Sequence, residues 1–385
     1  MLFAKLNDLS IGGKGSYGIA ASAVERKADL PTYLRITDIF DDGTLNLSEL
    51  KSVDAPNSDK YILKPNDIVF ARTGGSTGRN YFYDGSDGVF VYAGFLIKFS
   101  IDPEKVNPKY VKYYCRSKQY NDWVQSFNTG STRGNINAQI FGNMEIPLPE
   151  RKQQDYLVSI LEPIDEKIRN NKQVNDNLAE LLQTVYQERF GDVSAATEQG
   201  MLSDICSYSR DRVAVSELNA STYFSTENML PGKAGATEAA SLPTIPQTTA
   251  CHKGDTLISN IRPYFKKIVY CEDRCGCSTD VLCFTPVQPK YAAYLFSTLY
   301  ADKFFAFMVA GSKGTKMPRG DKQQIMAYPV ALPSDEELDE FNKLALPILA
   351  QLHSNKAENK RLSATRDALL PKLMSGEIDV SGIQL

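Results

Sequence analysis

The sequence predicts an α+β protein in which two tandem mixed α/β domains are each followed by a long helix. An internal repeat supports the tandem arrangement, because the segment from Pro163 to Val185 recurs from Pro347 to Leu369 at one offset of 184 residues without a gap. A heptad pattern supports the helices, because apolar residues in both copies follow alternating spacings of four and three. We therefore expect a pseudo-twofold repeat whose two helices pair as an antiparallel coiled coil.

The repeat divides the chain into four segments. The first domain spans residues 1–150 and is followed by a helical segment at 151–191, and the second domain spans 192–333 and is followed by a helical segment at 334–385. A chain of 385 residues is long enough for two or three domains. The segment 64–70 also parallels 252–258, so the repeat extends into the globular parts.

The composition is that of an ordinary folded protein, with 42% hydrophobic and 23% charged residues. We expect a cytoplasmic chain without membrane contact, because no run of 18 or more apolar residues occurs and the start resembles no signal peptide. The seven cysteines do not suggest a disulfide framework. The net charge of −3 arises in the two helical segments, which together carry 12 Lys and Arg against 16 Asp and Glu. Since the domains are near neutral, the acidic average does not exclude nucleic-acid contact by them.

Both domains combine strand-like and helix-like segments. In the first domain, runs rich in β-branched and aromatic residues predict strands at 33–39, 67–71 and 89–92, and a helix is expected at 108–128. In the second domain, strands are expected at 256–259 and 281–284, and a helix at 291–308. The aromatic face of the first helix fits a buried core better than a base-stacking surface.

The heptad pattern predicts which residues of the two helices face each other. In the first helix the seam residues are Leu161, Ile164, Ile168, Asn171, Asn175, Leu178 and Leu182. In the second helix they are Ile348, Leu352, Asn355, Asn359, Leu362 and Leu369. The alternative is an ordinary amphipathic helix packed on a globular core, but one shared register in two copies favours mutual pairing.

Two asparagines interrupt each seam near its middle. Polar seam residues reduce stability but fix register and orientation, and antiparallel pairing would bring Asn171 and Asn175 against Asn359 and Asn355. Prolines at 163 and 347 predict either a kink or a helix restart, and we expect the helices to end near residues 190–191 and 375–376. Helices of this length would be about 50–60 Å long. The sequence therefore suggests that the paired helices act as a ruler, with a domain at each end whose separation they set.

Two loops in each domain carry residues that suit DNA contact. Arginine reads guanine, asparagine reads adenine, and hydroxyl groups and backbone amides hold phosphates. The candidates in the first domain are Lys14, Arg72, Thr73, Ser76, Thr77, Arg79, Asn80, Ser131 and Arg133. The candidates in the second domain are Asn260, Arg262, Tyr264, Lys266, Lys267, Lys313, Lys316 and Arg319. Plain solvated loops are the alternative for any single residue, whereas the four loops together favour contact.

The sequence predicts no catalytic residue, metal ligand or bound cofactor in this chain. It has no P-loop and no Asn/Asp-Pro-Pro-Tyr/Phe segment, and it has only two histidines. The glycines at 13, 15 and 18 match a dinucleotide pattern without the strand that should precede it. A zinc site built from Cys271, Cys275, Cys277, Cys283 and His252 stays open as a minor alternative, because the spacings are not paired Cys-x-x-Cys.

These features together resemble the specificity subunits of type I restriction-modification systems. The resemblance rests on two diverged domains with near-identical helical segments, on Ile-Pro-Leu-Pro-Glu at 146–150, and on Leu-Leu-Pro-Lys-Leu-Met-Ser-Gly-Glu-Ile at 369–378. The strands that begin at Asn66-Asp67-Ile68-Val69 and Gly254-Asp255-Thr256-Leu257 also fit. One departure is the short segment ahead of the first domain.

The resemblance implies that the domains are target recognition domains, each reading half of a bipartite, asymmetric site in double-stranded DNA. It implies that the paired helices set the spacing and dock two DNA methyltransferase (modification) subunits, and that restriction motor-nuclease subunits join for cleavage. S-adenosylmethionine and ATP are then expected on those partners, and this chain is a non-catalytic subunit. A coiled-coil scaffold with two ligand-binding heads and no DNA role, or an enzyme with an unrecognised nuclease or zinc hydrolase centre, would be the alternatives.

Overall fold

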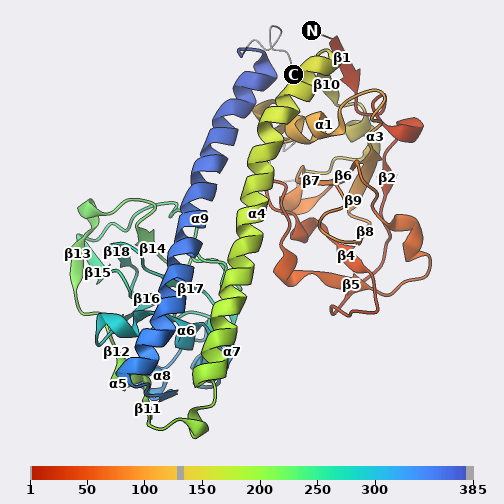
Figure 1. Ribbon diagram of the computed structural model, residues 1–385. Helices are drawn as coiled ribbons and strands as arrows, with labels where there is room; N and C mark the ends of the chain where they lie inside the picture. The colour runs from red at the N-terminus through yellow and green to blue at the C-terminus, as the bar shows by residue number, and fades with distance from the viewer. Residues whose placement is uncertain (1, 128–133, 379–385) are drawn as a thin grey trace. The chain divides into compact units, whose positions relative to one another are not determined.

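The computed structural model describes residues 2–127 and 134–378 and divides into two compact units. Unit 1 comprises Met1–Ile168 and Arg361–Leu385, and unit 2 comprises Arg169–Lys360. The two long helices, α4 (Arg151–Phe190) and α9 (Asp335–Ser375), therefore each contribute to both units. Figure 1 shows them as the longest elements of the chain.

Unit 1 contains the first domain. Its strands are β1 (Leu2–Lys5), β2 (Ser16–Tyr17), β3 (Ala23–Val24), β4 (Thr32–Leu34), β5 (Lys51–Val53), β6 (Asp67–Ala71), β7 (Asn80–Tyr83), β8 (Phe90–Tyr92), β9 (Leu96–Ser100) and β10 (Glu145–Leu148). Its short helices are α1 (Pro108–Tyr114), α2 (Lys118–Gln125) and α3 (Ala138–Gly142).

Unit 2 contains the second domain. Its strands are β11 (Gln199–Met201), β12 (Cys206–Tyr208), β13 (Arg212–Ala214), β14 (Tyr223–Phe224), β15 (Gln247–Cys251), β16 (Thr256–Ser259), β17 (Ile268–Tyr270), β18 (Cys275–Cys277), β19 (Val281–Pro286) and β20 (Pro329–Ala331). Its short helices are α5 (Leu202–Ile205), α6 (Ala292–Tyr300), α7 (Asp302–Ala310) and α8 (Lys322–Met326).

The sheets of the two units follow one plan. Unit 1 has sheets of strand order β1-β10, β2-β9-β6-β7 and β3-β5-β4-β8, and unit 2 has β11-β20, β12-β19-β16-β17 and β13-β15-β18-β14. Strand β6 runs antiparallel between β9 and β7, as β16 does between β19 and β17. Each unit also has a single parallel strand pair among its described residues, β4 with β8 and β14 with β18. The internal repeat predicted from the sequence is confirmed at the level of the sheets.

A buried aspartate closes the turn before each central strand. The carboxylate of Asp67 accepts a hydrogen bond from the Lys64 amide at 2.8 Å, and that of Asp255 accepts one from the His252 amide at 2.8 Å. The residue before each aspartate has a left-handed backbone, with φ of 73° at Asn66 and 91° at Gly254. Asparagine and glycine tolerate this conformation best, which explains the residue types of the repeated strand motif.

Both long helices run through their prolines. Pro163 lies inside α4, and Pro347 and Pro371 lie inside α9, so of the two predicted alternatives, a kink or a restart, the restart at 163 and 347 is excluded. Each proline removes one hydrogen bond, and the packed faces on either side keep the helix continuous. Helix α4 ends at Phe190, and α9 ends at Ser375, before Gly376 with a φ of 75°. Both ends fall where the sequence placed them.

The helices pair antiparallel within each unit. In unit 1, Leu157 and Leu161 of α4 share an apolar cluster with Leu370 and Met374 of α9. In unit 2, a second cluster contains residues near the end of α4 and near the start of α9, namely Leu182, Tyr186, Phe190, Phe341, Ala345 and Leu349. All the predicted seam residues are buried or half-buried. The buried stripe is wider than a two-helix seam, because each helix end also packs on the core of its domain.

Three predicted elements differ from the structure. The strand expected at 33–39 stops at Leu34, because the Asp38 carboxylate accepts a hydrogen bond from the Arg35 amide at 2.8 Å and holds a 3-10 turn. The helix expected at 108–128 divides into α1 and α2, and Ser117 caps the second piece. The helix expected at 291–308 divides into α6 and α7 at Ala301, whose backbone is extended. Side-chain hydrogen bonds of Asp38 and Ser117 override the apolar periodicity in the first two cases.

Candidate functional site

The two candidate loops of each domain meet beside the end of its central strand. In unit 1, Thr73 forms a β-bridge with Asn135, and the Ile136 amide donates to the Arg72 carbonyl at 2.9 Å. In unit 2, Ile261 forms a bridge with Arg319, and the Arg262 amide donates to the Pro318 carbonyl at 2.8 Å. The same arrangement in both copies makes this loop pair the candidate functional site of each domain.

Arg72 directly follows β6 and extends its side chain between two aromatic rings. Its guanidinium carbon lies 5.2 Å from the centre of the Tyr17 ring and 5.8 Å from that of Phe95. Both rings are partly exposed, and a cation held over aromatic faces is stabilised by their quadrupoles. Within the described ranges, no carboxylate lies within ion-pair distance of Arg72.

Three other candidates in the first domain hold the loop in place. The Thr77 hydroxyl lies 2.8 Å from the Gly74 carbonyl and 2.9 Å from the Gly134 carbonyl. Asn80 is buried, and its amide donates to the Cys115 carbonyl at 2.9 Å. Arg79 binds both oxygens of Asp41, at 2.7 and 3.1 Å. These three side chains are therefore engaged in hydrogen bonds or an ion pair within the protein.

The remaining candidates of the first domain are placed less tightly. Thr73 and Ser76 are half-buried in the loop, and Lys14 is exposed ahead of β2. Ser131 and Arg133 lie outside the described residues. Since the described part of their loop contacts Thr73 through the bridge at Asn135 and Arg72 through the Ile136 amide, the loop pair is defined without them.

In the second domain, carboxylates bind several of the candidate cations. Lys266 lies 2.9 Å from Asp302, Lys313 lies 2.5 Å from Asp321, and Arg319 lies 3.0 Å from Asp280. The pKa of the Asp321 carboxyl is below its ordinary value because of the hydrogen bond from Lys313. Half of the loop cations in this domain are therefore neutralised in the free chain.

The other candidates of the second domain vary in exposure. Asn260 occupies the position after β16 that Arg72 occupies after β6, but it is buried. Arg262 has a left-handed backbone with φ of 50°. Tyr264 is half exposed against Phe265, and Lys316 is exposed. Lys267 donates to the Thr226 carbonyl at 2.6 Å, and burial lowers its pKa.

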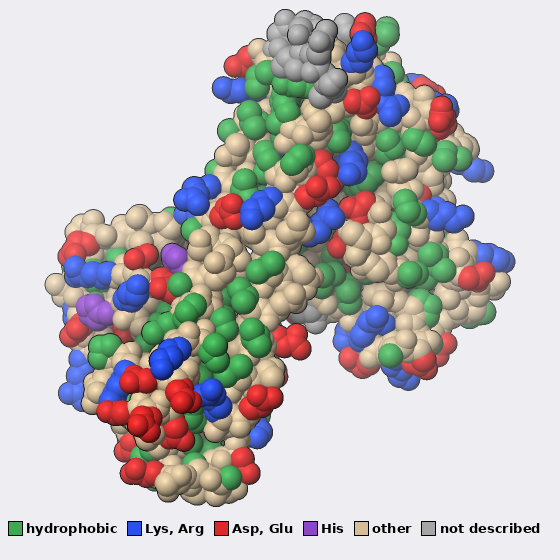
Figure 2. All heavy atoms as spheres, in the orientation of Figure 1, with side chains coloured by type: hydrophobic (Ala, Val, Ile, Leu, Met, Phe, Trp, Pro, Cys, Tyr) green, Lys and Arg blue, Asp and Glu red, His purple; other side chains and the backbone are tan. Residues whose placement is uncertain are grey.

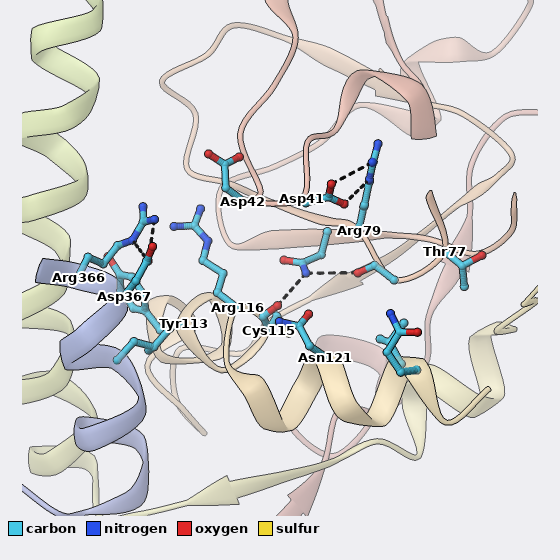
Figure 3. A pocket seen from close by; sticks show the side chains of 15 residues that line it. Asp41, Asp42, Thr77, Arg79, Tyr113, Cys115, Arg116, Asn121, Arg366 and Asp367 are labelled. Carbon is cyan, nitrogen blue, oxygen red and sulfur yellow. Dashed lines mark hydrogen bonds and ion pairs between the residues drawn. The ribbon is translucent and has the colours of Figure 1, made fainter. Parts of the chain in front are cut away.

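A cavity of about 490 Å³ lies in unit 1 between the base of the first loop and α9 (Figure 3). One wall carries the Arg79–Asp41 pair, and the other carries Arg366 and Asp367 from α9. Figure 3 shows Arg116 between them, from the segment that joins α1 to α2. Three carboxylates and three guanidinium groups line the cavity, so its walls carry no excess of either sign.

A buried ion network joins the first domain to both long helices within unit 1. Asp165 of α4 lies 2.9 Å from Arg116, 3.2 Å from Lys112 of α1 and 3.0 Å from Arg366 of α9. Glu162 lies 2.9 Å from Lys112. Burial alone would raise the pKa of the Asp165 carboxyl, but the surrounding cations hold it well below its ordinary value. Three separate segments are thereby fixed to one carboxylate.

The asparagines of the seam pair in unit 2. The Asn171 side-chain amide donates to the Asn359 oxygen at 2.9 Å, and the Asn355 amide donates to the Asn175 oxygen at 2.8 Å. These are the contacts that antiparallel pairing of the helices requires. The two hydrogen bonds are related by the repeat, because each asparagine of α4 corresponds to one of α9 at the offset of 184.

The cysteines considered for zinc lie in an apolar core of unit 2. Cys271, Cys275, Cys277 and Cys283 are buried with Cys251, Met229 and Leu257. The His252 side chain lies 3.0 Å from Asp211. Within residues 2–127 and 134–378, no group of three or more His, Cys, Asp or Glu is arranged to hold a metal ion.

The same residues include no helix long and apolar enough to cross a membrane.

Sequence reasoning missed the partners of two key side chains. Tyr17 and Phe95 are far from Arg72 in the chain and carry no spacing signal, although both are aromatic residues beside strands. The Asp165–Arg366 pair was also missed, because the sequence offers several acidic residues near Asp165 and no rule for choosing one. The surface charge agrees with the sequence better than these side-chain contacts do. Figure 2 shows acidic side chains gathered over the start of α9, where Asp335, Glu336 and Glu337 are exposed.

Comparison with known proteins gives one consistent family. Residues 26–180 match the family model of the type I restriction modification DNA specificity domain. The chain is 24% identical to the HindI specificity subunit of Haemophilus influenzae over 187 residues, covering 46% of this chain and 40% of that subunit. It is 22% identical to the MjaIX specificity subunit of Methanocaldococcus jannaschii over 307 residues, covering 73% of this chain and 71% of that subunit.

The fold has a similar solved counterpart. The crystal structure of the type I restriction-modification S subunit from M. genitalium matches with a TM-score of 0.53 and 17% identity, over 97% of this chain and 95% of that chain. The match supports the α+β fold with two domains and two long helices. The resemblance predicted from the repeated helical segments is confirmed by the sequence matches.

Proposed function

We propose that this chain, a relative of the type I restriction-modification specificity subunits, is the DNA-recognition subunit of such a complex. Each domain reads one half of a bipartite, asymmetric site in double-stranded DNA. The chain itself is non-catalytic, and two methyltransferase subunits dock on it to modify the site. Restriction motor-nuclease subunits join that assembly for cleavage, and the assembly works in the cytoplasm.

The repeated loop pair is the observation that carries this proposal. Two equivalent sites, each beside the end of a central strand, present different side chains on the same sheet plan. Arg72 follows the strand in the first domain, and Asn260 follows it in the second. Equivalent positions with different chemistry suit a protein that reads two different half-sites, whereas a scaffold with two heads for one ligand needs the same chemistry twice.

The paired helices supply surfaces for the partner subunits. Val174 and Leu181 of α4 and Leu344 and Leu346 of α9 are large apolar residues that stay exposed. The exposed acidic start of α9 adds negative charge, which complements a basic partner surface. S-adenosylmethionine and ATP would be held by the partner subunits.

The near-neutral domains have a consequence for affinity. Nucleic-acid affinity depends largely on phosphate contacts by Lys and Arg, and in the second domain several such residues are paired with carboxylates. The chain alone therefore binds DNA weakly, and the methyltransferase complex binds it tightly. Binding measured at increasing salt concentration, with and without the partner, tests this difference.

The direct test is the methylation pattern of a host that expresses the chain with its methyltransferase. Genome-wide methylation sequencing should reveal one bipartite motif that is absent from cells with the methyltransferase alone. Exchanging residues 192–333 for the corresponding domain of another specificity subunit should change one half of the motif and leave the other half intact. A complex that binds DNA without sequence preference, or methylation that does not depend on this chain, would refute the proposal.

The role of the helices as a ruler has its own test. Inserting one heptad into each helix, after Ile168 and before Arg361, keeps the seam in register and lengthens each helix by about 10 Å. The spacer between the half-sites should grow by about three base pairs at about 3.4 Å each. Heptads rewritten without a change of length serve as the control, and an unchanged spacer in the lengthened protein would overturn the ruler.

A further inference from the structure

We propose that Arg72 reads a guanine in the half-site bound by the first domain, and that Tyr17 and Phe95 position it for that contact. This inference rests on the proposed function and adds the identity of one base and of the residue that recognises it. Three observations support it: the Arg72 backbone is hydrogen-bonded on both sides, two aromatic rings lie beside its guanidinium, and no carboxylate among the described residues pairs with its charge.

The backbone of Arg72 is held on both sides. Its amide donates to the Phe95 carbonyl at 3.1 Å, and its carbonyl accepts from the Ile136 amide at 2.9 Å. The first bond ties the residue to the segment that leads into β9, and the second ties it to the second loop of the site. The side chain therefore starts from a fixed point, which lowers the entropy lost when it binds.

The aromatic frame restricts the guanidinium itself. The two ring centres lie 5.2 and 5.8 Å from the guanidinium carbon. The Tyr17 ring is anchored, because its hydroxyl accepts a hydrogen bond from the Ala138 amide at 3.2 Å. Tyr17 is 42% exposed and Phe95 is 55% exposed, so the frame lies at the surface, where a ligand can reach it.

One edge of the guanidinium is enclosed and the rest stays available. The Nε atom is buried and has no hydrogen-bond partner among the described residues. Arg72 as a whole is only half-buried, so the terminal nitrogens offer the donors that remain. Two parallel N–H donors at the tip of a fixed arginine form the geometry that binds two acceptors side by side.

The charge of Arg72 distinguishes it from the neighbouring arginines. Arg79 binds Asp41 through Nε and Nη2, and Arg116 and Arg366 share Asp165. No carboxylate among the residues that the structure describes pairs with Arg72. An uncompensated guanidinium in a rigid frame favours an electron-rich partner supplied by the ligand.

Guanine fits this arrangement best among the bases. In the major groove it presents the acceptors O6 and N7 side by side, and arginine binds both at once, whereas adenine places a donor beside N7. A phosphate would also accept hydrogen bonds from arginine, but phosphate contacts need no aromatic frame and carry no sequence information. The fixed orientation therefore points to the base edge.

The test uses the methyltransferase complex with Arg72→Lys, Arg72→Gln and Arg26→Ala, each analysed by methylation sequencing and by binding to DNA with single substitutions. The unaltered complex should require a G·C pair at one position of one half-site. Arg72→Lys should relax that requirement by about tenfold or more, and Arg72→Gln should shift the preference toward adenine. Arg26→Ala removes an exposed arginine of the same domain and should leave the motif unchanged.

The outcomes separate this inference from the function on which it rests. A bipartite motif that stays the same in both Arg72 variants, or binding that weakens equally for all sequences, would overturn the guanine contact and leave the recognition function standing. The absence of any bipartite motif from the unaltered complex would overturn both. Melting temperatures of the variants exclude unfolding, and Arg72→Lys retains the charge and most of the stem if Arg72→Gln does not fold.

Discussion

Positions of the two long helices that are related by the internal repeat make different contacts in the two units. Charged side chains pair in unit 1, and apolar side chains pack together in unit 2. In unit 1, Asp165 of α4 lies 3.0 Å from Arg366 of α9, inside a network of buried charges. The offset of 184 residues relates these two positions to Leu349 and Leu182, which are buried in one apolar cluster of unit 2. One repeat thus built an ionic contact at one end and an apolar contact at the other.

The difference has consequences for specificity and stability. Apolar contacts stabilise the helix pair without fixing which residue faces which. A buried carboxylate that is paired with three cations allows only one arrangement of the segments that carry them. The ionic end also receives two cations, Lys112 and Arg116, from the α1 region of the first domain. We infer that the ionic end fixes how the first domain sits on its helices, and that the apolar end supplies strength. The following variants test that division.

The largest effect is expected from Asp165→Ala. Removing the carboxylate leaves Lys112, Arg116 and Arg366 close together without their shared counter-charge, and breaking a buried pair from one side costs about 3–5 kcal/mol. Urea unfolding followed by the fluorescence of Trp123, the single tryptophan and a residue of unit 1, measures the loss. Glu166→Ala removes an exposed carboxylate of the same helix and is the control. A loss below about 1 kcal/mol for Asp165→Ala would show that the network does not stabilise unit 1.

The apolar end should respond to Leu349→Ala with a loss of about 2–4 kcal/mol, because the truncation removes buried surface and leaves a cavity. Leu349 is 3% exposed, whereas Leu346 on the same helix is 46% exposed, so Leu346→Ala is a matched control with little expected effect. Circular dichroism at 222 nm during thermal unfolding follows both. Equal losses for the two leucines would contradict the placement of Leu349 in the buried apolar cluster of unit 2.

The two ends should also differ in their dependence on pH. The pKa values of Asp165 and Glu162 are lowered in the folded chain by the surrounding cations. A lowered folded pKa gives stability that is fully present above the unfolded value of about 4 and is lost as the pH falls toward the folded value. Unit 1 should therefore lose roughly 2 kcal/mol between about pH 5 and pH 2.

The measurement is urea unfolding by Trp123 fluorescence at a series of pH values. Asp165→Asn should flatten the acid limb of that curve, because one of the two titrating carboxyl groups is gone, whereas Leu349→Ala should lower the curve without changing its slope. An unaltered acid limb in Asp165→Asn would assign the acid sensitivity to other carboxylates.

The sequence predicted the long helices better than the side-chain contacts that they make. The helices, their ends and the asparagine positions follow from periodicity and spacing, because a coiled-coil seam is a local pattern that repeats. The ionic contact between Asp165 and Arg366 escaped prediction, since neither residue is apolar and the heptad pattern does not say which charged side chains of the two helices meet. The candidate loops were identified, but which cations stay unpaired depends on Asp41, Asp280 and Asp321, whose positions come only from the tertiary fold.

The smallest expected effect, and the one that most sharpens the comparison, concerns the asparagines between the two ends. Asn355→Leu leaves the buried Asn175 oxygen without its donor, and an unsatisfied buried group costs about 1–2 kcal/mol. Adding Asn175→Leu removes the unsatisfied group and restores an apolar pair, so the double variant should be at least as stable as the unaltered chain. A thermal-unfolding cycle of the four proteins gives the coupling. Losses that simply add would mean that the two asparagines act independently and do not fix the register of the helices.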